Sequence, residues 1–354
     1  MQVRGTLVRG GTSKCWLFTE RDVPGTRTDL EAMLVAAYNA ADRRQIDGVG
    51  GATSTTSKAA VVGPSRAPDV DIDYLFAQVG IGEGRVEWGS NCGNCATAIA
   101  LYAVAKGLVP ADPRETRVRL RNVNTGSRLD AVVSTPGGRI SDHPNALVPG
   151  TDAAGVGVRL IFLAPGGGST GALLPTGRPA EPITIAGRRA RLSLLDAGAP
   201  VALLRAGDLG LTGDEDPAEL APWLPELIAV RAQAAIRMGL ARPGEPAPQA
   251  VPKVGIVGEP RGDRIGVRMV SMQEFHPAIG LTSAVALATA TRTPGSVLAG
   301  AAAPEGPARL RLATPSGEVA VRSSLTADGA VAEVELERAA RLIADAVIYL
   351  PAAA

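Results

Sequence analysis

Apolar and polar positions along the chain predict two similar series of strands and helices. Residues 5–23 contain an apolar strand, a tight turn of small residues, a second apolar strand and an Asp-apolar pair, and residues 191–209 repeat that order. Apolar residues at helical spacing follow each series, over 29–42 with Thr28 as the expected N-cap, and over 223–239. The same elements therefore occur twice in the same order.

Shorter elements continue the repeat. In both halves a lysine, Lys58 or Lys253, enters an apolar strand that ends in glycine. A further strand then leads into an Ala-rich helix, over 93–106 and over 282–292, and a hairpin follows each helix. Ala-rich helices suit the centre of a curved sheet, because small side chains let the strands approach closely on all sides.

The repeat predicts the fold class. We expect an α+β protein with two pseudo-symmetric halves, each a strongly curved, mostly antiparallel sheet around a central helix. The halves should span 1–180, which holds the lysine and cysteine site described below, and 181–354. The last strand, 346–350, should pair back onto one of the sheets.

Composition excludes several classes of protein. A chain of 354 residues with 45% apolar and 20% charged residues is globular and long enough for two domains. A net charge of +1 gives no basic excess for binding nucleic acid. The N-terminus has no apolar signal core, and no apolar run reaches the roughly 18 residues of a membrane span. We therefore expect a cytoplasmic protein with no membrane partner.

The first candidate site is the turn Arg9-Gly-Gly-Thr-Ser-Lys14, in which Thr12 and Ser13 place hydroxyl groups beside a cation. It does not match a phosphate-binding loop, because no helix starting with Lys-Ser or Lys-Thr follows it. A plain hairpin turn is the alternative interpretation.

The second candidate site is the Gly- and hydroxyl-rich segment 47–58, since long polar loops in compact domains are often functional. Lys58 ends this loop and begins an apolar strand, so its amine should be partly desolvated. Desolvation favours the neutral form of a lysine amine, which can act as a base. The alternative is a lysine that extends to solvent from the end of the strand.

The third candidate site is Ser90-Asn-Cys-Gly-Asn-Cys-Ala96, immediately before the first Ala-rich helix. At a helix N-terminus Cys92 should favour the thiolate, because the positive end of the helix dipole is nearby. Free N–H groups around Asn91, Gly93 and Asn94 form an expected binding site for a carboxylate or an enolate.

Cys92 and Cys95 also have the C-x-x-C spacing of metal and redox sites. Zinc needs about two more ligands, and the rest of the chain offers only Cys15, His143 and His276 without paired spacing. A redox dithiol normally lies in a βαβ unit, which the repeat does not resemble. We therefore expect no metal, no disulfide framework and, in the absence of any motif for one, no organic cofactor.

The fourth candidate site is segment 272–283, the second half's counterpart of the cysteine segment, and it contains no cysteine. We expect His276, Thr282 and Ser283 to bind substrate, together with Lys253. Thr282 and Ser283 are also suited to capping the helix, and a lone histidine is often structural.

The motifs together resemble a known family. Arg9-Gly-Gly-Thr-Ser-Lys14, Asp47-Gly-x-Gly-Gly with Ser-Thr-Thr-Ser-Lys58, and Asn91-Cys-Gly-Asn94 are similar to those of the PrpF-like isomerases. That group includes 2-methylaconitate cis–trans isomerase, methylitaconate isomerase and 4-oxalomesaconate tautomerase. Segments 173–177 and 338–351 are similar too, so the resemblance covers essentially the whole chain. It implies a diaminopimelate epimerase-like fold with the site between two halves.

The resemblance also implies residue roles. Lys58 would be the base that removes a proton, Cys92 the neighbouring acid or base, and Ser13 a hydroxyl that contacts substrate. The implied reaction is a cofactor-independent allylic double-bond shift or cis–trans isomerisation of a small unsaturated di- or tricarboxylate. Two positions depart from the family pattern: Cys15 stands where glycine is common, and Cys95 adds a thiol. Both lie next to the expected site, which leaves the particular polycarboxylate open.

Two other functions remain as alternatives. One is a racemase or epimerase with two facing cysteines, which the absence of cysteine from 272–283 disfavours. The other is a non-catalytic accessory protein of an aconitase-like enzyme, which an intact Lys58 and Cys92 disfavour, because binding alone needs no base. The expected partner is a small unsaturated polycarboxylate, and a homodimer is left open.

Overall fold

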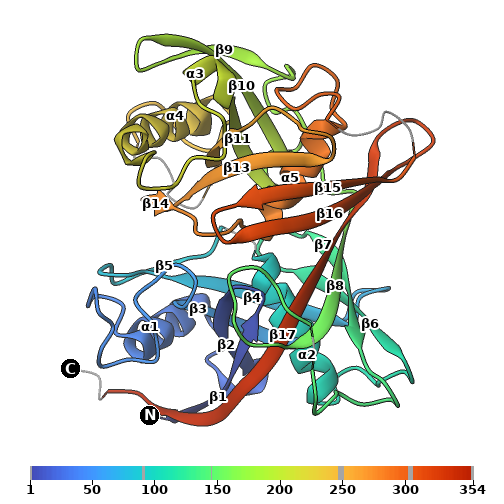
Figure 1. Ribbon diagram of the computed structural model, residues 1–354. Helices are drawn as coiled ribbons and strands as arrows, with labels where there is room; N and C mark the ends of the chain where they lie inside the picture. The colour runs from blue at the N-terminus through green and yellow to red at the C-terminus, as the bar shows by residue number, and fades with distance from the viewer. Residues whose placement is uncertain (1, 90–91, 145, 246–250, 302–305, 352–354) are drawn as a thin grey trace. The chain divides into compact units, whose positions relative to one another are not determined.

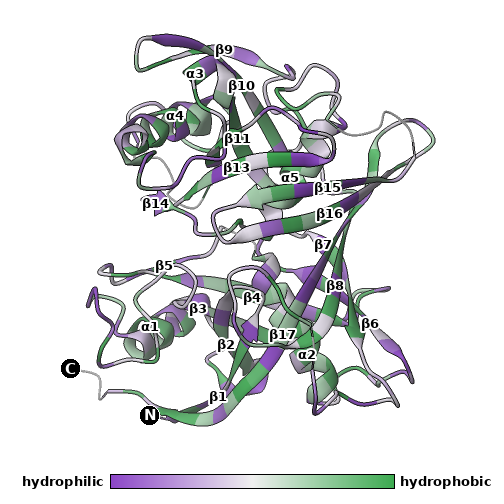
Figure 2. Ribbon diagram, in the orientation of Figure 1, coloured by the Kyte–Doolittle hydropathy of each residue, from purple (hydrophilic) through white to green (hydrophobic). Residues whose placement is uncertain are grey.

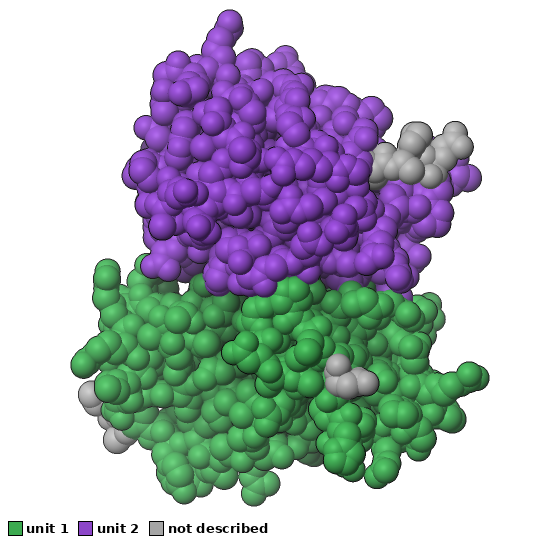
Figure 3. Space-filling view, viewed as in Figure 1, with its two compact units in different colours: residues 1–160, 337–354 green, residues 161–336 purple. Residues whose placement is uncertain are grey.

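The structure, a computed structural model, describes residues 2–89, 92–144, 146–245, 251–301 and 306–351. The chain divides into two compact units, residues 1–160 with 337–354, and residues 161–336 (Figure 3). Strands predominate in both units, and helices are few (Figure 1).

The first unit is a mixed sheet with two longer helices. Its strands are β1 (Gln2–Gly10), β2 (Ser13–Thr19), β3 (Lys58–Pro64), β4 (Ile72–Val79), β5 (Val86–Glu87), β6 (Glu115–Asn122), β7 (Arg128–Ser134), most of β8 (Val156–Leu163) and the C-terminal part of β17 (Val331–Tyr349). Its helices are the short η1 (Glu20–Asp22), α1 (Arg27–Tyr38) and α2 (Gly93–Ala105).

Strand pairing in this unit follows a simple order. β1 pairs antiparallel with β2, β2 parallel with β3, and β3 antiparallel with β4. β4 pairs antiparallel with β5 and parallel with β6, and β6 pairs antiparallel with β7. Parallel neighbours need a crossover connection, and here α1 and α2 lie in the two crossovers.

Helix α2 is the buried helix of the first unit. Its residues from Gly93 to Val104 are all buried, and it packs against β1, β2 and β7. A helix that is apolar on every side belongs inside a core, and the hydropathy colouring of α2 agrees (Figure 2). The approach to β1 is very close, because a Cβ added at Gly10 would lie 1.9 Å from the backbone oxygen of Asn94. The predicted Ala-rich helix at 93–106 is therefore confirmed.

Helix α1 packs on a separate core cluster, where Leu30 and Leu34 meet Trp16 and Phe18. The predicted N-cap, Thr28, was wrong. The helix begins two residues earlier because the Thr26 hydroxyl oxygen accepts a hydrogen bond of 3.1 Å from the backbone N–H of Asp29.

The second unit has the strands β9 (Glu181–Ile185), β10 (Arg188–Ala197), β11 (Ala199–Arg205), β12 (Lys253–Val257), β13 (Arg264–Ser271), β14 (Glu274–Phe275), β15 (Ala308–Thr314) and β16 (Gly317–Leu325). Its helices are α3 (Ala206–Leu209), η2 (Ala221–Trp223), α4 (Leu224–Arg237) and α5 (Leu281–Thr291). The predicted helices over 223–239 and 282–292 correspond to α4 and α5.

Pairing in the second unit also has a simple order. β10 pairs antiparallel with β11, β11 parallel with β12, and β12 antiparallel with β13. β13 pairs antiparallel with β14 and parallel with β15, and β15 pairs antiparallel with β16. Every residue of α5 is buried, and the helix packs against β10, β11 and β16.

Strand β17 contributes to both units. Its first residues, 331–336, pair with β16 in the second unit. Residues 340–349 pair antiparallel with β1 in the first unit, with Gln2 opposite Tyr349. In the part of the chain that the structure describes, no helix is long and apolar enough to cross a membrane.

Candidate active site

Lys58 is the buried lysine of the first unit, with 9% of its surface exposed. Its Nζ donates a hydrogen bond to Oε1 of Gln78, the residue directly opposite it on β4. The same Nζ lies 5.2 Å from the centre of the Phe76 ring. The expected desolvation of Lys58 is therefore confirmed, and among the described residues no carboxylate forms an ion pair with it.

Gln78 holds the start of β3 in place from two directions. Its Oε1 accepts from Lys58, while its Nε2 donates to the Ser57 backbone oxygen at 3.0 Å. The buried Tyr38 hydroxyl donates to the backbone oxygen of Lys58. Both the side chain and the backbone of Lys58 are thus fixed by hydrogen bonds from the core.

Cys92 is the N-cap residue of α2 and is half-buried. Hydrogen bonding with the Cys95 thiol and burial raise the pKa of Cys92 well above its usual value, although the charge of Lys58 acts in the opposite direction. The predicted thiolate was wrong, because the neighbouring thiol and the burial outweigh the helix dipole. The raised pKa favours the protonated thiol, which can donate a proton.

The two other cysteines lie deeper, each with 1% of its surface exposed. Burial, followed by hydrogen bonding with Cys15, raises the pKa of the Cys95 thiol well above its usual value. Cys95 therefore has a thiol neighbour on either side, Cys92 near the helix start and Cys15 on β2. Cys15 and Cys95, the two residues that depart from the family pattern, are therefore neighbours in one group of three thiols.

Asn94 connects the helix start to the first candidate turn. Its Nδ2 donates to the hydroxyl oxygens of Thr12 at 3.1 Å and Ser13 at 3.3 Å. Because these oxygens accept from Asn94, the hydroxyl hydrogens remain available to donate to a ligand. Asn94 Oδ1 is buried and has no hydrogen-bond partner among the residues that the structure describes, which is unusual for a polar atom in a core.

The start of α2 adds backbone donors to this group. The first hydrogen bond within the helix runs from the Ala96 N–H to the Cys92 oxygen. The N–H groups of Gly93 and Asn94 precede it and have no acceptor within the helix, whereas the Cys95 N–H bonds to the Cys92 sulfur. Together with the helix dipole they favour a negative charge at this position.

The structure thus brings together, within the first unit, most of the residues predicted there. Lys58, Cys92 and Asn94 surround the helix start, and Thr12 and Ser13 bond to Asn94. Asn91 lies outside the described residues. Gln78 was not among the predicted residues, and its only signal was a polar residue within the apolar second half of β4.

The other predicted residues belong to the second unit. Thr282 and Ser283 are buried in the first turn of α5, and Lys253 begins β12. The ring of His276 accepts a hydrogen bond of 2.9 Å at Nδ1 from the Ala278 N–H, which orients it. Their convergence with Lys58 stays a prediction. No group of three metal-ligating side chains occurs in the described ranges.

The mixed sheet with its buried helices is similar to the folds of a solved proline racemase and a solved hydroxyproline epimerase. A probable proline racemase from Agrobacterium radiobacter superposes with a TM-score of 0.60 at 14% identity, covering 99% of this chain and 93% of that chain. A structure of methylitaconate-delta-isomerase is more similar, with a TM-score of 0.82 at 28% identity, covering 99% of this chain and 96% of the other.

The chain belongs to the PrpF protein family, whose model matches residues 1–351. The 4-oxalomesaconate tautomerase of Pseudomonas putida is 38% identical over 97% of this chain and 95% of its own length. The family expected from the sequence motifs is therefore confirmed.

Proposed function

We propose that this protein is a cofactor-independent isomerase that moves a proton on a small unsaturated di- or tricarboxylate. The observation that supports the proposal is the buried amine of Lys58 at the start of β3, whose charge acts on the Cys92 thiol at the start of α2. The names of its relatives, 4-oxalomesaconate tautomerase and methylitaconate-delta-isomerase, support this class of substrate.

The reaction needs two proton transfers and no change in oxidation state. Neutral Lys58 removes a proton from the carbon next to the double bond, and the electron pair of that C–H bond becomes part of a dienolate. The N–H groups at the start of α2 stabilise the negative charge, an effect typically worth about 3–4 kcal/mol per donor. The Cys92 thiol or the Lys58 ammonium group then returns a proton at the far carbon of the original double bond, so that the double bond moves by one position. Where Cys92 donates, the proton on the Lys58 ammonium group passes to the Cys92 thiolate and restores both residues.

The hydroxyl groups of Thr12 and Ser13 would hold a carboxylate of the substrate. Asn94 donates a hydrogen bond to each of their oxygen atoms, so both hydroxyl groups keep their own hydrogen to donate to the ligand. In this scheme Asn94 is a positioning residue that acts through the two hydroxyls.

We further propose that the chain consists of two pseudo-symmetric halves, 1–180 and 181–354, and that Lys253, His276, Thr282 and Ser283 complete the substrate site. The pairing order supports the repeat: β10 to β16 follow the same sequence of antiparallel and parallel pairings as β1 to β7. In each unit the second parallel pairing follows a fully buried helix, α2 or α5.

Proton exchange tests the function directly. The purified protein is incubated in D₂O with 4-oxalomesaconate, 3-methylitaconate, 2-methylaconitate or aconitate, and NMR follows deuterium incorporation and product formation. We expect exchange and isomerisation with at least one of them. Exchange at the α-carbon of proline with none of these acids turning over would favour the racemase alternative, and no exchange at all would favour an accessory protein.

A further inference from the structure

Arg338 is a buried arginine in the first unit, with 7% of its surface exposed. It lies on β17 next to Ala339, whose backbone oxygen accepts a hydrogen bond of 2.8 Å from the Gly11 N–H. Its Nη1 donates to the backbone oxygen of Glu337 at 2.9 Å. In the described part of the chain Arg338 forms no ion pair and no other hydrogen bond, although a guanidinium group has five N–H donors.

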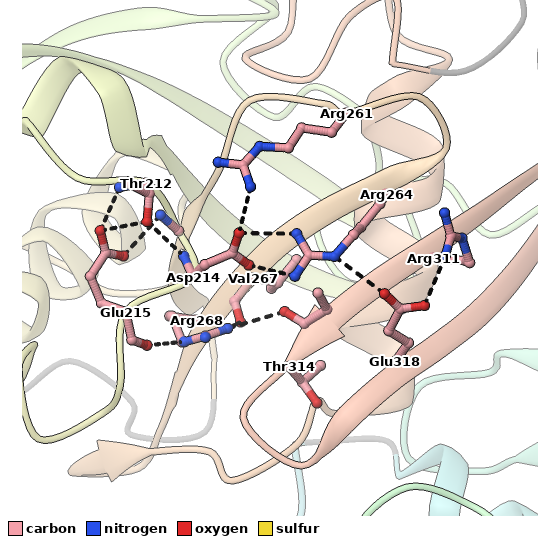
Figure 4. Close-up of polar contacts among 12 residues, drawn as sticks. Thr212, Asp214, Glu215, Arg261, Arg264, Val267, Arg268, Arg311, Thr314 and Glu318 are labelled. Atoms are coloured by element: carbon pink, nitrogen blue, oxygen red, sulfur yellow. Dashed lines mark hydrogen bonds and ion pairs between the residues drawn. The ribbon is translucent and has the colours of Figure 1, made fainter.

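Arg268, in the second unit, is a second buried arginine, and its guanidinium group has several hydrogen-bond acceptors. It is 6% exposed, and it donates to the backbone oxygens of Glu215, Val267 and Ala313 (Figure 4). Burial lowers the pKa of Arg268, but Asp214 and Glu215 oppose that effect. The carboxylate of Asp214 in turn binds Arg264 and Arg261. Arg268 is therefore held by three backbone acceptors beside a network of charged side chains.

Arg338 has no such network. Burial lowers its pKa to about 10, and only Glu337 acts in the opposite direction. The side chain still carries its charge at neutral pH. A buried charge without a counter-ion costs free energy, and proteins normally compensate for it with a partner or a ligand.

The position of Arg338 indicates which kind of ligand it would bind. A Cβ added at Gly11 would lie 3.6 Å from Cδ of Arg338 and 2.1 Å from the unpartnered Oδ1 of Asn94. Arg338 and Asn94 therefore border the same glycine, directly before Thr12 and Ser13. An unpaired cation, two hydroxyls held by Asn94 and the start of α2 all lie around one turn.

We propose that Arg338 binds a carboxylate group of the ligand that this turn holds, which in the proposed function is a carboxylate of the unsaturated substrate. The guanidinium group offers two parallel N–H donors that match the two oxygens of a carboxylate, a geometry that lysine cannot provide. Arg338 thereby favours substrates with a second carboxylate over monocarboxylates.

Equilibrium binding separates this role from catalysis. The probe is propane-1,2,3-tricarboxylate, a saturated acid with no allylic proton, and calorimetry on the full chain measures its Kd. Arg338→Met keeps an unbranched apolar side chain but removes the guanidinium group and its charge, and we expect Kd to rise about 10- to 100-fold, the loss of one or two charged hydrogen bonds. The Kd of Arg338→Lys should lie between those of the wild type and Arg338→Met. Arg341→Gln, which removes an exposed cation three residues along β17, should keep the wild-type Kd.

Stability without ligand gives the second measurement. If Arg338 is a ligand anchor, Arg338→Met removes an uncompensated buried charge, so its unfolding midpoint in urea should equal or exceed that of the wild type. A variant that is less stable or fails to fold would overturn the proposal, since Arg338 would then be structural. Wild-type affinity in folded Arg338→Met, or no binding by the wild type, would overturn it as well. Binding without proton exchange on any substrate would refute only the proposed function.

Discussion

The Lys58 amine and the Gln78 amide face each other across the β3–β4 pair and are joined by a hydrogen bond from Nζ to Oε1. A neutral amide orients the amine without adding a charge. A carboxylate at the same place would add a negative charge beside the amine and favour its ammonium form. Glutamine is therefore compatible with the proposed role of Lys58 as a base.

Exchanging that amide for a carboxylate tests the relationship. We expect Gln78→Glu to move the pH of half-maximal deuterium exchange upward, because the new ion pair stabilises the ammonium form. Gln78→Met, which removes the hydrogen bond without adding charge, should lower the rate with little change in the pH profile. The measurement is the exchange rate between pH 6 and 10, and an unshifted profile in Gln78→Glu would show that residue 78 does not influence the base.

Removal of Lys58 should abolish the chemistry. Loss of a general base typically costs about 100- to 10,000-fold in rate, so Lys58→Ala should lose solvent-deuterium incorporation by that factor. The matched control is Lys106→Ala, which removes a lysine whose ion pair with Asp345 is on the surface and which should retain full activity. Near wild-type exchange in Lys58→Ala would exclude this lysine as the base.

The two thiols at the start of α2 should differ in their importance. Cys92 is half-buried and feels the charge of Lys58, so Cys92→Ala should strongly reduce isomerisation. Cys95 is buried like a small apolar residue, and Cys95→Ala should keep most of the exchange rate. Equal losses in both variants would make the second thiol part of the chemistry and revive the two-thiol alternative.

The thiols also predict a dependence of stability on pH. The pKa values of Cys92 and Cys95 are raised in the folded state, so folding favours the protonated forms. Their stabilising contribution is complete below the unfolded thiol pKa of about 8.5 and is lost as the pH rises toward the folded values. Urea unfolding should show the free energy of unfolding falling between pH 8 and 9.5, and Cys95→Ala should flatten that fall. A profile in Cys95→Ala as steep as that of the wild type would rule out the thiols as its cause.

A methyl group at Gly11 should damage the site more than the fold. Gly11 has φ of 51°, a conformation that costs a side-chain-bearing residue about 1 to 3 kcal/mol, and the new Cβ would meet Asn94 Oδ1. Gly107→Ala is the matched control, with φ of 68° and no atom within 4 Å of the added Cβ. Both variants should lose similar stability in thermal unfolding, but only Gly11→Ala should also lose affinity for propane-1,2,3-tricarboxylate.

The helices and the place of Lys58 followed from local pattern. Ala-rich stretches without a polar face predict buried helices, and a lysine that enters an apolar strand predicts a desolvated amine. Both features depend on a few neighbouring residues, which is why the sequence revealed them.

Gln78 and Arg338 depend on partners that are distant in sequence. Gln78 matters because the β3–β4 register places it opposite Lys58, and a shift of one residue would turn it to the other face. In the sequence, Arg338 is surrounded by charged and small residues that give no sign of a binding site. Its position becomes informative only because the fold places β17 beside the turn at Gly11. The pKa of Cys92 likewise depends on burial and on the neighbouring thiol of Cys95. The prediction from the sequence considered only the helix dipole and included neither effect.

Strand β17 links the order of synthesis to the assembly of the first unit. Thr6 on β1 donates to Asp345 on β17 across a separation of 339 residues, so β1 gains this neighbour, in addition to β2, only after the ribosome has made both units. Until then β1 is an open sheet edge, a known template for aggregation. Pairings between such distant segments also form slowly. The unit that carries Lys58 and Cys92 is therefore the last to be completed, and a nascent chain should have little activity before its C-terminal strand is released.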